Sequence, residues 1–141
     1  MKLLACHIDN FGKLSNLNLN FNGDFNQLCN ENGWGKTTLS IFIKAMFYGM
    51  SASRENVKME RKKYMPWQGG VYGGSIDFVF SKGRYRIVRH FGKTPEADEV
   101  QLLNLDNNKE IEFPKEGLGE WIFGVGKETF ETTAFFPQMN I

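Results

Sequence analysis

The stretch that decides the fold of this chain is a glycine-rich run ending in Gly-Lys-Thr, Asn30-Glu31-Asn32-Gly33-Trp34-Gly35-Lys36-Thr37-Thr38. Before it, residues 25–29 alternate apolar and polar side chains, as a short β-strand does. After it, apolar residues recur at helical spacing as far as Gly49, where a helix would end. A strand, a glycine loop and a helix in this order are the context of a phosphate-binding loop. We therefore expect a helix over residues 36–48 with a phosphate site at its N-terminus.

The residue types in this run suit a bound phosphate chain. Gly33 and Gly35 let backbone N–H groups approach a phosphate closely, and the helix N-terminus adds unpaired N–H groups and a positive dipole end. Lys36 would reach the β- and γ-phosphates, the Thr37 hydroxyl would ligate Mg²⁺, and Thr38 would donate toward the α-phosphate. The predicted cofactors are therefore ATP and Mg²⁺. The full set of predicted nucleotide-binding residues is Lys13, Asn32, Gly33, Trp34, Gly35, Lys36, Thr37 and Thr38.

Two residues depart from the usual phosphate-loop pattern and leave an alternative open. Asn30 stands where the pattern has glycine, although asparagine is among the few other residues that tolerate positive φ. Trp34 replaces a small residue, and its ring could crowd a ligand. A module that binds no nucleotide and acts only through protein contacts is thus the second hypothesis. A small-molecule kinase is a weaker third one, because no second acidic or arginine-rich catalytic segment follows the loop.

Composition bounds the class of protein. With 141 residues and a net charge of +1, the chain is one domain or a piece of a larger one, and no global field attracts it to nucleic acid or membrane. Its two cysteines, Cys6 and Cys29, lie in predicted strands and are read as structural thiols of a reducing cytoplasm. The sequence shows no membrane-length apolar run and no signal peptide. We expect a cytoplasmic protein.

The rest of the chain reads as short strands with two helical stretches near its end. We expect strands over residues 2–10, 17–21, 75–80, 85–91, 100–105 and 110–113, with a hairpin turn at 81–84. Helical stretches are expected over 117–123 and 127–133. Arg86 and Arg89 are read as strand-face charges, and His7 as a strand residue with a local hydrogen bond. Residues 50–66 carry five basic residues against two acidic ones and are expected to be mobile, a lid over the nucleotide or a DNA-facing patch being the functional alternatives.

Four blocks in sequence resemble one group of ATPases: "MKLLACHIDNFGKLSNLNLNF" with "NENGWGKTTL", then "YMPWQGGVYGGSIDFVF", "GRYRIVRHFGK" and "ETFETTAFFPQ". The chain resembles the N-terminal half of an ATP-binding-cassette-type head of the SMC, RecN and SbcC group, and most of all YhaN-like proteins. The resemblance implies an α/β P-loop NTPase fold, in which a mixed, largely antiparallel sheet packs on the phosphate-loop helix. It also implies a single lobe over residues 1–141 and a role in DNA repair or chromosome maintenance.

The same resemblance assigns a role to Gln138 and implies what lies elsewhere. In that group a glutamine after a strand contacts Mg²⁺ and the attacking water, and Gln138 matches it, so Thr37 and Gln138 are the predicted metal ligands and Gln138 the predicted catalytic residue. The signature motif and an Asp-Glu strand end have no match here. The resemblance implies that a C-terminal lobe supplies them, that heads pair as homodimers on ATP, and that DNA is a partner. We accordingly expect a piece of a longer coiled-coil protein that does not hydrolyse ATP alone.

Overall fold

The computed structural model describes residues 2–21, 33–50, 63–66, 69–93, 97–114, 117–126 and 129, and for residues 33–37 it describes the backbone alone. Within these ranges six strands and two helices follow one another along the chain. They are β1 (Lys2–Phe11), β2 (Leu14–Asn20), α2 (Gly33–Tyr48), β3 (Gly73–Phe80), β4 (Gly83–His90), β5 (Glu99–Asn104), β6 (Lys109–Ile111) and α4 (Leu118–Phe123).

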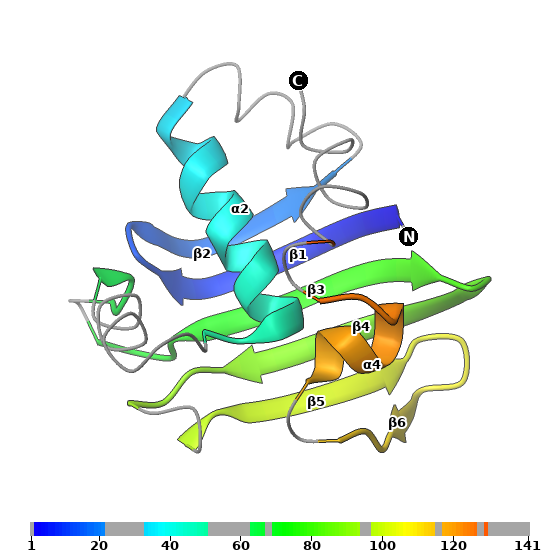
Figure 1. The fold of residues 1–141 in the computed structure, drawn as a ribbon. Helices are drawn as coiled ribbons and strands as arrows, with labels where there is room; N and C mark the ends of the chain where they lie inside the picture. The colour runs from blue at the N-terminus through cyan, green and yellow to red at the C-terminus, as the bar shows by residue number, and fades with distance from the viewer. Residues whose placement is uncertain are drawn as a thin grey trace.

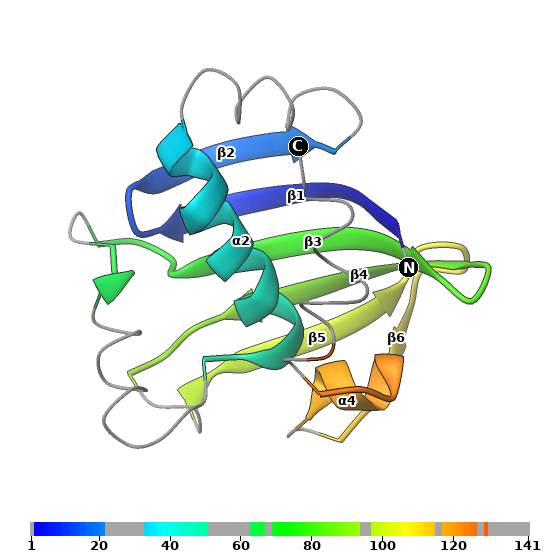
Figure 2. The same cartoon turned by 45° about the horizontal axis from the view of Figure 1, so that its top comes forward.

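The six strands form one sheet in the order β2-β1-β3-β4-β5-β6, and every neighbouring pair is antiparallel. Both helices lie over the same face of this sheet, α2 crossing its middle and α4 lying near β5 and β6 (Figures 1 and 2). The described part of the chain thus confirms an α/β architecture in which a largely antiparallel sheet packs on the helix of the glycine-rich run. The predicted strand over residues 25–29 lies outside the described residues.

The core is the interface between α2 and the sheet. Leu39, Phe42, Ile43 and Met46 are all inaccessible to solvent, as the helical spacing of these residues predicts. The helix begins at Gly33, three residues before the predicted start at Lys36. Glycine accepts helical dihedral angles as readily as others, so the run Gly33–Gly35 can continue a helix at a modest cost in conformational entropy.

Two side chains fasten the C-terminal end of α2. Arg89 on β4 is 6% exposed, and its Nε donates a hydrogen bond of 3.0 Å to the carbonyl oxygen of Met46. Arg89 lies on a strand, as expected, but it is buried, because a guanidinium can satisfy the unpaired carbonyls at a helix C-terminus from within the core. The hydroxyl of Tyr48 donates a hydrogen bond of 2.9 Å to the carbonyl of Val125, which ties the last residue of α2 to the chain beyond α4.

The turns set the strand boundaries. The β1–β2 turn contains only Gly12 and Lys13, so β2 begins at Leu14 and not at the predicted Leu17. Ser81 and Lys82 have φ values of 51° and 67° in the β3–β4 hairpin, which is the positive-φ pair of a type I′ turn. The strands predicted over 100–105 and 110–113 are present as β5 and β6, which pair as a hairpin, and the helix predicted over 117–123 is present as α4. The helical stretch expected over 127–133 lies outside the described residues except for Thr129.

Candidate nucleotide-binding site

The N-terminus of α2 has the chemistry of an anion site. Its first residues are Gly33, Trp34, Gly35 and Lys36, with no acidic side chain in the first turn. The first four N–H groups of a helix have no partner within the helix, and the dipole places partial positive charge at the same end. This donor set fits a phosphate group, because it combines the first N–H groups of a helix with a lysine and has no acidic residue in the first turn.

The β1–β2 turn lies against the first half of α2. A Cβ placed on Gly12 would be 3.7 Å from Cγ2 of Thr38 and 3.1 Å from Cδ1 of Tyr64. Gly12 has a φ of 59°, and its N–H donates a hydrogen bond of 2.7 Å to the carbonyl oxygen of Tyr64. Two segments that carry predicted nucleotide-binding residues, the Lys13 turn and the Thr38 turn of the helix, are therefore neighbours in the fold.

Tyr64 also packs at this junction of the β1–β2 turn and α2, and it is not among the site residues predicted from the sequence. Its ring stacks on that of Phe11 with centroids 5.0 Å apart and planes 13° from parallel, and Phe11 in turn meets Phe42 of α2 edge-on at 5.3 Å. Tyr64 lies near the end of the stretch 50–66 that is expected to be mobile; residues 51–62 of that stretch lie outside the described residues, and its mobility remains a prediction. The signal was present: Tyr64 is the first aromatic residue after the basic run and directly precedes Met65 and Pro66.

The remaining predicted site residues lie outside what the structure describes. This applies to Asn32 and Gln138, and to the side chains of Trp34, Lys36 and Thr37, whereas Gly33 and Gly35 are described as part of the α2 backbone. Lys13 is exposed and Thr38 is partly buried. The assignments of nucleotide, metal and catalytic roles to these residues remain predictions.

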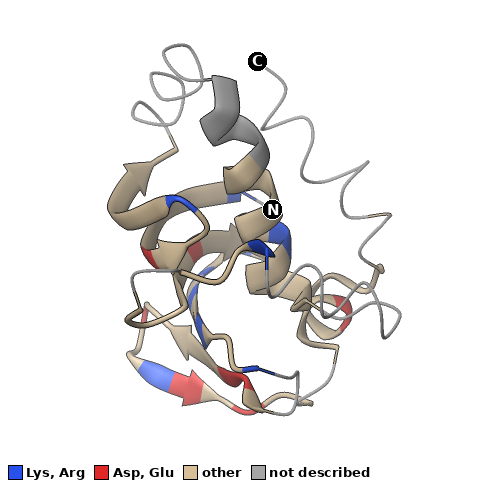
Figure 3. Ribbon diagram, turned by 90° about the vertical axis from the view of Figure 1, so that its left-hand side faces the viewer, with Lys and Arg blue, Asp and Glu red and all other residues tan. Residues whose placement is uncertain are grey.

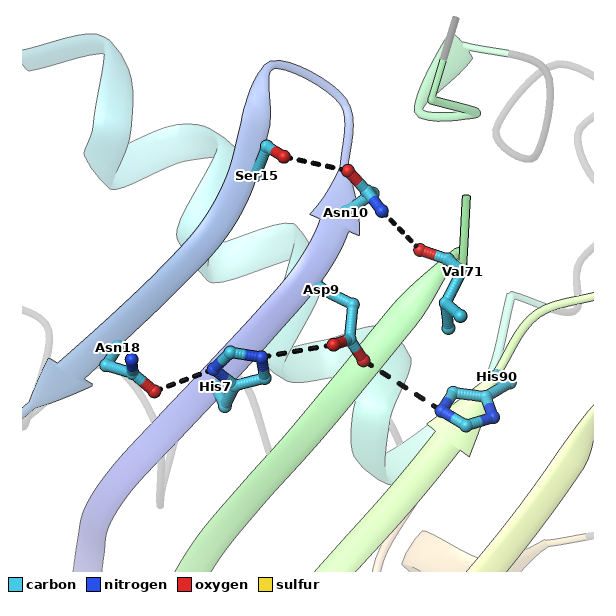
Figure 4. A network of polar contacts seen from close by, with 7 residues as sticks. All are labelled: His7, Asp9, Asn10, Ser15, Asn18, Val71 and His90. Carbon is cyan, nitrogen blue, oxygen red and sulfur yellow. Dashed lines mark hydrogen bonds and ion pairs between the residues drawn. The ribbon is translucent and has the colours of Figure 1, made fainter. Parts of the chain in front are cut away.

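A polar network on the sheet face away from α2 is a second place where chemistry-bearing side chains gather (Figure 4). Nδ1 of His7 lies 2.6 Å from Oδ1 of Asn18, and its Nε2 lies 3.1 Å from Oδ1 of Asp9. The other oxygen of Asp9 is 3.9 Å from Nε2 of His90. These groups pair with one another, and among the described residues no three His, Cys, Asp or Glu side chains could hold a metal ion. The network confirms that His7 makes local hydrogen bonds within the sheet.

An apolar groove between α4 and the sheet is a third candidate. It encloses about 320 Å³ and is lined by Phe78, Phe80, Ser81, Tyr85, Leu102, Ile111, Trp121 and Ile122. Trp121 is 49% exposed at its rim. None of the described lining residues carries a positive charge, so the described part of the groove offers no group that recognises a phosphate chain.

Burial accounts for the raised pKa of the Cys6 thiol. Cys6 on β1 is 5% exposed, and this burial, with a smaller effect from the Asp77 carboxylate, raises the pKa of its thiol to about 12. A thiol with so high a pKa stays neutral and is a poor nucleophile or metal ligand. The structural role predicted for Cys6 is the one its surroundings favour.

Charge on the described surface is mixed. Figure 3 shows lysine and arginine interspersed with aspartate and glutamate over the described residues. Arg86, for example, donates two hydrogen bonds to the Asp77 carboxylate, at 2.7 and 2.9 Å.

The helices in the described ranges include none that is long and apolar enough to cross a membrane.

Comparison with known proteins places the chain in a family. A family model described as "AAA domain" matches residues 5–140. The chain is 35% identical over 78 residues to "Uncharacterized protein YhaN" of Bacillus subtilis (strain 168), a match that covers 55% of this chain and 7% of that protein. It is 43% identical over 56 residues to "Septu protein PtuA" of Bacillus thuringiensis, covering 38% of this chain and 14% of that protein. The matches thus span only a small part of either curated relative. Because the family model covers nearly all of the sequence, the chain belongs to the AAA domain family of nucleotide-binding ATPases.

Proposed function

We propose that this chain binds Mg-ATP at the N-terminus of α2. The observation that carries the proposal is that the family match over residues 5–140 includes a helix that begins with Gly33-Trp34-Gly35-Lys36 and has no acidic residue in its first turn. Membership in the AAA domain family supports a nucleotide as the ligand, and the chemistry of the helix start supports this end as its phosphate site.

Each predicted site residue would have its own role in binding the nucleotide or the metal ion. Backbone N–H groups around Gly33 and Gly35, with Lys36, would hold the phosphates. Thr37 and Gln138 would ligate Mg²⁺, which neutralises phosphate charge when bound. The nucleotide would also contact Asn32, Trp34 and Thr38. Lys13 would approach it from the β1–β2 turn, which lies next to Thr38.

At a finer level we propose an N-terminal lobe of a head of the SMC, RecN and SbcC type. Support comes from the antiparallel sheet packed on α2 and from the similarity to YhaN over part of the chain. On this proposal the partners are a C-terminal lobe of the same protein, a second head that pairs with the first when ATP binds, and DNA. The pathway would be DNA repair or chromosome maintenance.

Direct binding tests the phosphate site. Mg-ATP is titrated calorimetrically into the wild type, Lys36→Ala and Lys44→Ala. Lys44 lies on the same helix, two turns farther from the N-terminus, and controls for loss of a helix charge. Hydrogen bonds to charged groups contribute about 1.5–3 kcal/mol each, so loss of Lys36 should weaken binding by at least about tenfold. Equal affinity in the wild type and Lys36→Ala would reject the phosphate-loop role.

Turnover tests the finer proposal. Phosphoryl transfer requires a positioned water and stabilisation of developing charge, and Lys36, Thr37 and Gln138 supply neither a carboxylate base nor donors from a facing head. We expect no steady hydrolysis by residues 1–141 alone and restored hydrolysis when a C-terminal lobe is added in trans. Gln138→Ala should then lower the rate more than it lowers ATP affinity. Steady hydrolysis by residues 1–141 that Lys36→Ala abolishes would contradict this placement.

A further inference from the structure

We propose that Tyr64 is a positioning residue of the nucleotide site, which holds the β1–β2 turn against α2 so that Lys13 meets the bound nucleotide. The inference rests on the proposed function. It goes beyond it by giving a role to a residue that neither the glycine-rich run nor the family match singles out.

Tyr64 contacts the β1–β2 connection in two independent ways, through its backbone carbonyl and through its ring. Its carbonyl oxygen accepts a hydrogen bond of 2.7 Å from the N–H of Gly12, the residue directly before Lys13. Its ring stacks on Phe11, the residue before that, at 5.0 Å. The backbone of Tyr64 thus holds Gly12 of the turn, and its side chain holds Phe11, the last residue of β1. A stacked aromatic pair of this kind contributes about 0.5–1.5 kcal/mol beyond its buried area.

The stacked pair of Tyr64 and Phe11 also contacts α2. Phe11 is fully buried and meets Phe42 edge-on at 5.3 Å, so the stack fixes the turn relative to the helix. Gly12 lies between Tyr64 and Thr38, where a Cβ would be 3.1 Å from the Tyr64 ring and 3.7 Å from Cγ2 of Thr38, and its φ of 59° favours glycine. Lys13 is therefore presented from a turn that lies beside the Thr38 segment of α2.

The arrangement matters because a lysine on a mobile turn loses conformational entropy on binding a phosphate, whereas one on a fixed turn loses less. Within the described residues, Tyr64 contacts Phe11 through its ring and Gly12 through its carbonyl oxygen, and its hydroxyl takes part in neither contact. Tyr64→Phe should therefore preserve the positioning, while Tyr64→Ala should remove the stack and loosen the turn.

The test is a double-mutant cycle on ATP affinity. The dissociation constant for Mg-ATP is measured for the wild type, Tyr64→Ala, Tyr64→Phe, Lys13→Ala and Tyr64→Ala/Lys13→Ala. We expect Lys13→Ala and Tyr64→Ala each to weaken binding by about tenfold, near the lower end of the value of one charge-assisted hydrogen bond. Tyr64→Phe should bind as the wild type does. In the Lys13→Ala background, Tyr64→Ala should have no further effect, because Tyr64 acts through Lys13.

Controls separate positioning from loss of stability. Phe123→Ala removes an aromatic contact of 5.1 Å with Phe47 at the opposite end of α2, and it should lower the unfolding midpoint without changing ATP affinity. If Tyr64→Ala does not fold, Tyr64→Leu replaces it, because leucine fills part of the ring's volume but cannot stack on Phe11. Its loss of affinity should likewise vanish in the Lys13→Ala background.

The outcomes are distinct. If the wild type and Lys36→Ala bind ATP alike, the proposed function fails and the positioning role fails with it. If Lys36→Ala abolishes binding but Tyr64→Ala binds as tightly as the wild type, the function stands and the positioning role is overturned. It is also overturned if Tyr64→Ala weakens binding equally with and without Lys13.

Discussion

The contact between Gly119 of α4 and Tyr48 of α2 yields a sharp prediction about how the helices are held together. Gly119 is buried, and a Cβ placed on it would lie 2.5–2.7 Å from three carbons of the Tyr48 ring. Alanine at a helical position is ordinarily better than glycine by about 1 kcal/mol. Here we expect Gly119→Ala to destabilise the protein, because the ring has to move.

The magnitude follows from three contributions. Overpacking of a tight contact costs about 1–3 kcal/mol. Displacing the ring also strains the hydrogen bond of 2.9 Å from the Tyr48 hydroxyl to the Val125 carbonyl, which is worth about 0.5–1.5 kcal/mol. Offset by the gain in helix propensity, the net loss is about 1–3 kcal/mol. At roughly 3 °C per kcal/mol for a chain of this size, the unfolding midpoint should fall by about 3–9 °C.

Thermal and urea unfolding followed by far-UV circular dichroism measures the effect, and Tyr48→Ala supplies the matched background. Without the ring, Gly119→Ala should be neutral or stabilising. Gly117→Ala and Gly124→Ala are controls, because each has open space around the new Cβ but a positive φ, 78° and 71°, so their cost should not depend on Tyr48. A Gly119→Ala cost that is the same with and without the Tyr48 ring would refute the reasoning.

Three further predictions concern stability. Folded Cys6 keeps its proton until its pKa of about 12, whereas the unfolded chain releases it at the ordinary value of 9.0, so stability should fall as pH rises through this window. By about pH 10.5 the free energy of unfolding should have fallen by about 2 kcal/mol. Tyr48 acts in the same direction, because burial raises the pKa of its hydroxyl to about 12. Urea titrations at several pH values should show a shallower decline in stability for Cys6→Ala. Asp77→Asn should cost about 1 kcal/mol, and the loss should shrink in high salt because the Asp77–Arg86 pair is partly exposed; a salt-independent loss would point to packing. Ser81→Asn with Lys82→Gly should stabilise the protein by up to about 1 kcal/mol in chemical unfolding, since both positions have positive φ; destabilisation would contradict the assigned turn.

The local pattern of the sequence predicted the elements but not their long-range contacts. The helical spacing from Leu39 to Met46 identified the buried face of α2, and alternation identified the strands around the 81–84 turn, because both signals are periodic and local. The burial of Arg89 could not be read in this way. Period-two alternation places Arg89 on the same face as Ile87, yet its charge favours solvent, and only the carbonyl of Met46 beside it in space decides the matter.

The candidate site shows the same division. The glycine-rich run and Lys36 were predictable because phosphate chemistry uses them at fixed spacing. Tyr64 was not, since it lies 52 positions after Gly12 in the sequence and contacts it only in the folded chain. The helix start at Gly33 was also missed, because glycine gives no sequence signal that distinguishes a loop from the first turn of a helix.

The central claim, that a nucleotide's phosphates bind at the N-terminus of α2, is tested most directly by amide NMR spectra recorded during titration with Mg-ATP. An amide that donates to a phosphate shifts strongly, so the account predicts the largest changes at Gly33, Gly35 and Lys36, smaller ones at Lys13 and Thr38, and none at the apolar groove beside Trp121. Lys36→Ala should remove these changes at matched nucleotide concentration. Saturable changes centred on the Trp121 groove or on the His7–Asp9–His90 network, with the amides of Gly33 and Gly35 unmoved, would contradict it.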